Sequence, residues 1–205
     1  RVPLGASSLL LSVLFLFFTF ELHKRIISVN NATDITLIQQ VIKGDEKALR
    51  VIIERYRERL YRLAYSLLGD GAAEDAVQET FIVLWRRARR YDSRHSLSTW
   101  LYTICCRECY DEMRRRRRRG KAVEAMPQPV ADTNRLEADE LLGLLRWATA
   151  QLPAKQRIVY QLREVEGLST EETLLIAKMT PEQVKANLWA ARKGVKEKLK
   201  EYGIQ

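Results

Sequence analysis

The chain has 205 residues and a net charge of +9, with a pI near 9.6, so an acidic partner such as nucleic acid or an anionic membrane is expected. Glycine (9) and proline (5) are sparse, which favours an all-helical fold. The three cysteines all fall between Cys105 and Cys109, which argues against a secreted disulfide framework and favours a reducing compartment.

Residues 2–20 carry no charge and are rich in Leu and Phe. This apolar leader (residues 1–33) predicts either a membrane anchor or sequence upstream of the true start, since the chain begins at Arg1; we weigh these two equally. A cleaved signal peptide is least favoured, because the basic residues lie mostly after the run. We expect a cytoplasmic protein, with membrane association only through residues 2–20.

Three helices are predicted next. Asp34 caps the first, which ends at Gly44, and the second covers residues 46–68. The third covers residues 72–90 and is expected to place Phe81 and Trp85 inward. Its acids lie near its start and its arginines near its end, an asymmetry that the helix dipole alone could favour.

Residues 100–119 predict one long helix with two different faces. Its apolar stripe comprises Leu97, Leu101, Ile104, Cys105, Cys109 and Met113. The opposite face is aromatic and cationic, and six arginines, Arg114 to Arg119, follow. Guanidinium groups attract phosphates and an aromatic ring can stack on an unpaired base, so this helix predicts nucleic-acid binding. A solvated surface helix is the simpler alternative.

After Gly120 the sequence loosens into a flexible linker with Pro127 and Pro129. Helical pattern resumes at about residue 135, and a further helix is expected at 154–166. Ser169 then opens a short helix, and Thr180 with Pro181 opens a longer basic one. This order predicts a helix-turn-helix, although a helical hairpin that merely packs fits the same pattern equally well.

Five segments carry a family resemblance. They are LYRLAYSLLGD (60–70), AEDAVQETFIVLW (73–85), LSTWLYTI (97–104), LPAKQRIVYQL (152–162) and VKANLWAARK (184–193). In this order the chain resembles the extracytoplasmic-function (ECF) group of bacterial RNA polymerase sigma factors over roughly residues 34–200. The resemblance implies an all-α fold of two small domains, a region 2 bundle at 34–119 and a region 4 helix-turn-helix at 135–205, joined by the flexible linker at 120–134.

The resemblance also implies partners and site residues. Core RNA polymerase would bind through its largest-subunit clamp coiled coil and its flap, with promoter DNA and an anti-sigma factor as further partners. The clamp contacts would be Asp75, Gln78 and Glu79. Contacts with the −10 element would be Trp100, Tyr102, Thr103, Arg107, Tyr110, Arg114, Arg115 and Arg116. Contacts with the −35 element would be Glu182, Gln183, Lys185, Asn187, Arg192 and Lys193.

Three positions depart from the family pattern. Arg107 stands where the −10-reading helix commonly has Asn, and Asn187 stands where the −35-reading helix commonly has Arg. Lys178 occupies a turn position usually filled by Gly, so it must make the bend in another way. Promoter sequence therefore does not follow from the resemblance.

No cofactor, metal site or enzymatic activity is predicted. Cys106 and Cys109 have a metal-ligand spacing, but zinc needs four ligands and neither His23 nor His95 lies at a suitable spacing, so we favour packing. The sequence thus predicts an ECF-type sigma factor that directs transcription initiation. The alternative is a membrane-anchored helix-turn-helix regulator that acts without polymerase.

Overall fold

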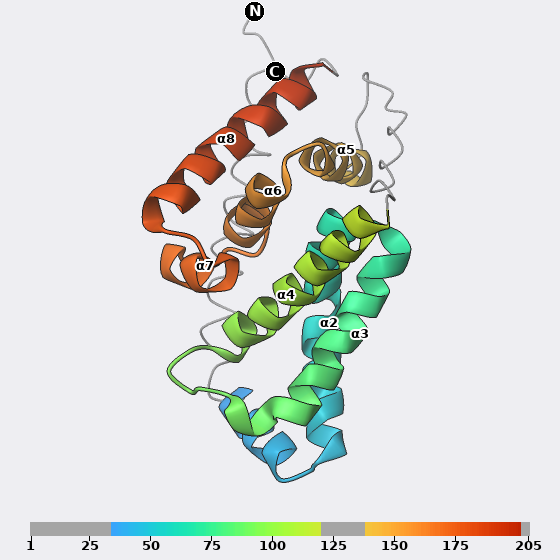
Figure 1. Cartoon of the computed structure of the whole chain (residues 1–205), viewed down its shortest axis with the longest axis vertical. Coiled ribbons are helices and arrows are strands. Elements are labelled where there is room, and N and C mark those ends of the chain that lie inside the picture. Colours follow the sequence, from blue (N-terminus) through green and yellow to red (C-terminus); the bar gives the residue numbers. More distant parts are fainter. Residues whose placement is uncertain (1–33, 120–137, 202–205) are drawn as a thin grey trace, which may run out of the picture.

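The computed structural model describes residues 34–119 and 138–201, and these ranges are helical with short connections (Figure 1). The apolar leader and the expected linker lie outside the described residues. A helical segment at residues 34–42 precedes α2 (Glu46–Leu68), α3 (Asp70–Arg87), a 3₁₀ turn (Ala88–Arg90) and α4 (Leu97–Arg118). We call residues 34–119 the first module. Within the described ranges, no helix is both long and apolar enough to cross a membrane.

The second module, residues 138–201, comprises α5 (Ala138–Ala150), α6 (Ala154–Tyr160), a π-helical turn (Gln161–Val165), α7 (Thr170–Ala177) and α8 (Pro181–Lys200). The sequence predicts one helix from 154 to 166, whereas the structure widens its last turn into the π-helical segment. The Glu166 N–H accordingly donates to the Gln161 carbonyl at 2.9 Å. Gly167, at φ 67°, then turns the chain toward α7.

Local sequence explains the helix ends. The Asp45 carboxylate accepts from the Lys47 N–H at 2.8 Å and starts α2, and Ser96 starts α4 by accepting from the Thr99 N–H at 3.1 Å. Ser169 forms the predicted capping box with Glu172. Thr180 forms a second capping box with Gln183. These caps fix where α7 and α8 begin.

Lys178 makes the turn between α7 and α8 in the left-handed conformation, with φ 53° and ψ 52°. That conformation crowds Cβ against the backbone and costs about 1–2 kcal/mol in a residue other than glycine. The turn expected for a helix-turn-helix is therefore made without a glycine, and Lys178 carries the strain.

The two modules share one hydrophobic core. In the first module α2, α3 and α4 bury Ile52, Leu60, Leu84 and Leu101 almost completely. The same cluster includes Ile158, Leu162, Leu168, Ile176 and Ala177 from the second module. A smaller cluster joins α5 to α8 through Trp147, Leu152, Ala191 and Val195. In Figure 1, α7 lies beside the N-terminal half of α4, which it contacts. The modules are thus packed against each other.

Candidate nucleic-acid interface

The two faces predicted for α4 are confirmed. Leu97, Leu101, Ile104, Cys105 and Cys109 are buried, and Met113 packs partly buried against them. Arg107 and Arg114 are exposed, while Trp100, Thr103 and Tyr110 are half-buried on the same side. At about 100° per residue these five side chains lie within one outward arc of the helix. We call them the α4 outer face.

Trp100 is held by packing. Its ring lies 5.5 Å from the Tyr91 ring, centroid to centroid, at an interplanar angle of 52°. The Tyr91 hydroxyl in turn donates to the His95 carbonyl at 2.7 Å. This tilted pair orients the half-buried indole at the start of α4, and an aromatic ring in such a place can stack with an unpaired base.

Tyr102 lies apart from the α4 outer face. It is fully buried, on the side of α4 that faces the second module, and its hydroxyl donates to Glu166 at 2.5 Å. Burial and the nearby Glu166 carboxylate hold its pKa well above the usual range, so the phenol remains a donor. Thr103 is satisfied within its helix, because its hydroxyl donates to the Thr99 carbonyl at 2.7 Å.

The arginines at the end of α4 are not equivalent. Arg114 pairs with Asp111 at 3.4 Å, and Arg115 pairs with Glu112 at 3.0 Å. Arg116 also pairs with Glu112, and its Nη1 donates to the Leu68 carbonyl at 2.8 Å. Because Leu68 ends α2, Arg116 ties the two helix ends together. Arg117 to Arg119 are exposed, so they offer the charge most available to phosphates.

In α8 the structure brings together only part of the predicted −35 set. Lys185, Arg192 and Lys193 lie on one exposed arc with Glu182, and Arg192 pairs with Glu164 at 2.7 Å. Asn187 is half-buried about 160° away from the centre of this arc, and its amide donates to the Gln183 carbonyl at 2.7 Å. The Gln183 side chain closes the capping box by accepting from the Thr180 N–H at 3.0 Å.

The centre of the α8 arc is Trp189, which sequence reasoning missed. It is 67% exposed, and the Lys193 ammonium lies 5.6 Å from its ring centroid. In the sequence, Lys185 and Lys193 lie four positions before and after Trp189, and this helical spacing could have placed the ring among the basic side chains. The arc therefore combines an aromatic ring with positive charge, as the α4 outer face does.

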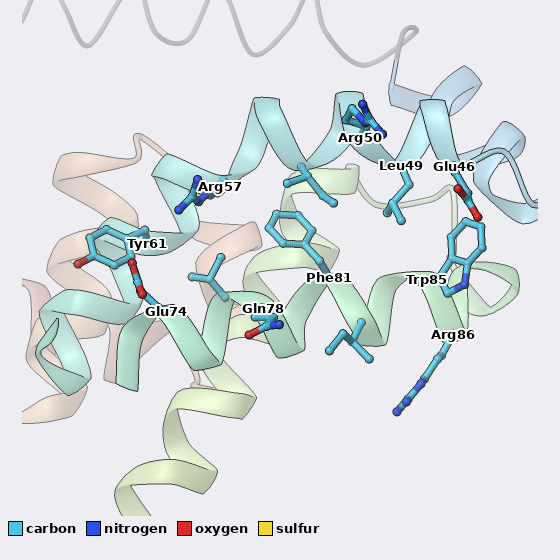
Figure 2. Close-up of a pocket in the computed structure, with 13 residues that line it drawn as sticks. Glu46, Leu49, Arg50, Arg57, Tyr61, Glu74, Gln78, Phe81, Trp85 and Arg86 are labelled. Carbon is cyan, nitrogen blue, oxygen red and sulfur yellow. The ribbon is translucent and has the colours of Figure 1, made fainter. Parts of the chain in front are cut away.

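A groove of about 910 Å³ lies on the surface between the packed helices α2 and α3 (Figure 2). Apolar side chains form its floor, among them Leu49, Ile53 and Phe81. Glu46 and Trp85 lie at one end, Tyr61 and Glu74 at the other. Trp85 is 38% exposed here, so its expected inward position was wrong: it lies where the buried face of α3 meets the surface.

The predicted polymerase contacts lie near this groove. Gln78 is exposed and lines it, and Asp75 is exposed on an adjacent part of α3. Glu79 is half-buried and lies about 100° around the helix from Gln78. The apolar floor and Trp85 were not among the predicted contacts.

All three cysteines are buried thiols. Burial raises the pKa of Cys106 well above the usual range, and a hydrogen bond with Cys105 together with burial does the same for Cys109. Protonated, enclosed thiols are poor metal ligands. Across residues 34–119 and 138–201, no His, Cys, Asp and Glu side chains gather in a way that could hold a metal ion.

Comparison with known proteins places these features in a family. The model of Sigma-70 region 2 matches residues 52–119. The ECF RNA polymerase sigma-E factor of Salmonella typhimurium is 27% identical, over 82% of this chain and 94% of that protein. The ECF RNA polymerase sigma factor SigW of Bacillus subtilis is 28% identical, over 80% of this chain and 95% of that protein.

Solved structures are similar to this chain as well, and two of them illustrate the likeness. The sigma factor RpoE of Bartonella quintana, in complex with the anti-sigma factor NepR, is 27% identical with a TM-score of 0.64, over 75% of this chain and 98% of that one. CnrH, in complex with the cytosolic domain of CnrY, shares the fold at 21% identity with a TM-score of 0.62, over 82% of this chain and 97% of that one. Residues 52–119 thus match region 2 of the sigma-70 family, and most of the chain is similar in sequence and fold to extracytoplasmic-function sigma factors of bacterial RNA polymerase.

Proposed function

We propose that this chain is a dissociable promoter-specificity subunit that binds core RNA polymerase, recognises two promoter elements and helps to open the DNA. The observation that carries the proposal is the pairing, in a chain of this family, of an aromatic and basic α4 outer face with a helix-turn-helix whose α8 arc is also aromatic and basic. The polymerase supplies the chemistry, and this chain supplies recognition.

The α2–α3 groove is the proposed contact with the polymerase clamp coiled coil. An apolar floor with Leu49 and Phe81 suits the apolar side of a helix, and the charged rim suits its flanks (Figure 2). Asp75 and Gln78 would meet polar or basic groups beside the groove. Glu79, turned away from Gln78, would contact the clamp only at its margin.

The α4 outer face is the proposed contact with the non-template strand of the −10 element. Taking a base out of the stack costs a few kcal/mol, and stacking on an aromatic side chain returns about 1–3 kcal/mol per base. Trp100 and Tyr110 supply the rings, and Arg107 and Arg114 supply charge for the backbone. The proposal places Arg107 where sequence preference would be set.

The α8 arc is the proposed contact with the −35 element in the major groove. Lys185, Arg192 and Lys193 would neutralise phosphates, and Glu182 at the first turn would lie near base edges. Asn187 would take part only if α8 rolled about its axis, because its side chain now bonds within the helix.

An anti-sigma factor is the proposed regulatory partner. The RpoE structure contains the anti-sigma factor NepR, and CnrH is bound to the cytosolic domain of CnrY. By the same relationship, an anti-sigma factor of this chain would bind surfaces needed for polymerase or DNA.

The test is equilibrium binding of the full chain to purified core RNA polymerase, followed by transcription from a promoter library. The proposal predicts saturable binding to the core enzyme and transcripts that depend on added chain. A chain that binds duplex DNA but not core polymerase would refute the proposal and would favour the regulator that acts without polymerase.

A further inference from the structure

Four exposed arginines surround the C-terminal end of α3. They are Arg86 and Arg87 at the end of the α-helix, and Arg89 and Arg90 at the end of the 3₁₀ turn that follows it. Ala88, between the two pairs, is only 3% exposed and packs into the core. Residues three positions apart share one side of such a turn, so the arginines fill an outward arc opposite Ala88. Figure 2 shows Arg86 projecting away from α2. We call these four residues the α3-end arginines.

The charge of the α3-end arginines is not compensated by nearby carboxylates. Residues 80–91 contain these four arginines and no Asp or Glu, which gives a local net charge of +4. Across residues 34–119 and 138–201, none of the four side chains forms an ion pair or a hydrogen bond. In α4, by contrast, residues 107–116 hold four arginines and three carboxylates, and each of these arginines forms an ion pair at 3.0–3.4 Å. The unpaired positive charge near Trp100 therefore lies at the end of α3 rather than in the middle of α4.

The helix dipole does not account for all four charges. A cation near a helix C-terminus is stabilising, but this effect is limited to the last turn and is satisfied by one or two side chains. Like charges three positions apart repel each other, and the α3-end arginines include two such pairs. Folding stability alone therefore favours fewer arginines at this place. An anionic ligand that relieves their repulsion accounts for the cluster better.

The α3-end arginines adjoin the aromatic start of the α4 outer face. Arg90 directly precedes Tyr91, whose ring lies 5.5 Å from the Trp100 ring. At the other end of α4, beyond its ion-paired middle, Arg117 to Arg119 are exposed. At about 1.5 Å per residue, Arg117 lies about 25 Å from Trp100 along the helix. A strand laid along α4 therefore meets exposed cations at both ends and nearly balanced charge between them.

We propose that the α3-end arginines bind phosphates of the DNA strand whose unpaired base stacks on Trp100. Phosphates repeat along a strand, so a strand stacked on Trp100 carries negative charge past the adjoining arginines. An acidic protein segment would have no need of the aromatic pair beside these cations. Phosphate contacts position a strand without reading its sequence, so this surface serves any promoter that the α4 outer face accepts. The inference rests on the proposed function for the identity of the strand, but strand binding itself can be measured without polymerase.

The test is the salt dependence of binding between the full chain and a fluorescent single-stranded thymidine oligonucleotide, measured by anisotropy. Each phosphate that a cation neutralises contributes about 0.7 to the log–log slope for a single strand. Arg86→Gln with Arg89→Gln, or Arg87→Gln with Arg90→Gln, should therefore lower the slope by about 1.4, and all four changes should lower it by about 2.8. Between about 50 and 200 mM salt, wild type should then lose about 50-fold more affinity than the quadruple variant.

Two further variants separate phosphate binding from net charge and from folding. Arg146→Gln with Lys155→Gln also removes two charges, from exposed positions on α5 and α6, and should leave the slope unchanged. Replacing all four α3-end arginines by Lys keeps their charge and should restore the wild-type slope, because an ammonium group binds phosphate as a point charge. Thermal unfolding and circular dichroism of each variant should show an unchanged helix content and no loss of Tm.

Lower slopes for the glutamine variants, restored by lysine, support the phosphate surface. The inference is overturned if wild type does not bind the oligonucleotide, if the glutamine variants keep the wild-type slope, or if the control on α5 and α6 loses as much. It is also overturned if the quadruple variant binds DNA normally but loses core polymerase, since the arginines would then belong to a protein contact. If wild type binds the strand through these arginines but neither binds polymerase nor directs transcription, the proposed function fails and the phosphate surface stands.

Discussion

Trp85 gives a sharp test of the α2–α3 groove. We expect Trp85→Ala to weaken binding of the full chain to core RNA polymerase about 30-fold. A tryptophan can bury up to about 250 Å², and Trp85 is 38% exposed in the free chain. A helix in the groove would therefore cover up to about 95 Å² more of it. At about 25 cal/mol per Å², covering most of this area contributes about 2 kcal/mol, which corresponds to roughly 30-fold in Kd.

The assay is competition binding against a labelled sigma factor on core polymerase, with thermal unfolding of each variant measured in parallel. Val51→Ala is the matched control, because Val51 is 40% exposed on α2 but does not line the groove. Trp85→Phe should recover most of the affinity by keeping an aromatic ring. A folded Trp85→Ala chain that binds within twofold of wild type would refute the assignment of the groove.

Three further predictions concern the turn, the ring and the arginines. Lys178→Gly should stabilise the chain by up to about 1 kcal/mol in urea unfolding, since it relieves the left-handed strain against a small entropic cost; destabilisation would contradict this. Trp100→Ala should slow open-complex formation, followed by stopped-flow fluorescence of promoter DNA, more than it weakens polymerase binding; equal losses would mean that its role is misassigned. Replacing Arg117 and Arg118 by Ala should reduce the salt dependence of single-strand DNA binding by about 1.4 in log–log slope without lowering Tm. Arg116→Ala should lower Tm instead, through loss of its hydrogen bond to the Leu68 carbonyl. A lower Tm for the Arg117 and Arg118 variant, with Arg116→Ala changing only the salt dependence, would contradict these roles.

Features set by neighbouring residues could be predicted well from the sequence. Ser169 with Glu172 forms a capping box, and Thr180 with Pro181 starts α8, because both devices act within one turn. The buried and outward faces of α4 follow from its period in the same way. The family resemblance then implied the roles proposed for these residues, which composition alone could not.

Features set by contacts between distant segments were missed. Tyr102 was expected near DNA, but it lies under Glu166, which is 64 positions later in the chain. The turn that aims Glu166 inward depends on a π-helical segment, which periodicity alone does not distinguish from an α-helix. Trp85 was expected inward because it falls on the helical period of the buried face of α3. That period does not show that its side chain lies at the border of the face, where it is 38% exposed. The exposure of Trp189 depends on which face of α8 packs against α5 and α6, and the charge pattern of α8 does not show this.

The central claim is that this chain directs core RNA polymerase to promoters. The most direct measurement is mapping of transcription start sites with purified core polymerase and genomic DNA, with and without the full chain. The account predicts start sites that need the chain and share two sequence elements, centred near −10 and −35. Start sites that are identical with and without the chain, although it is folded, would contradict the account.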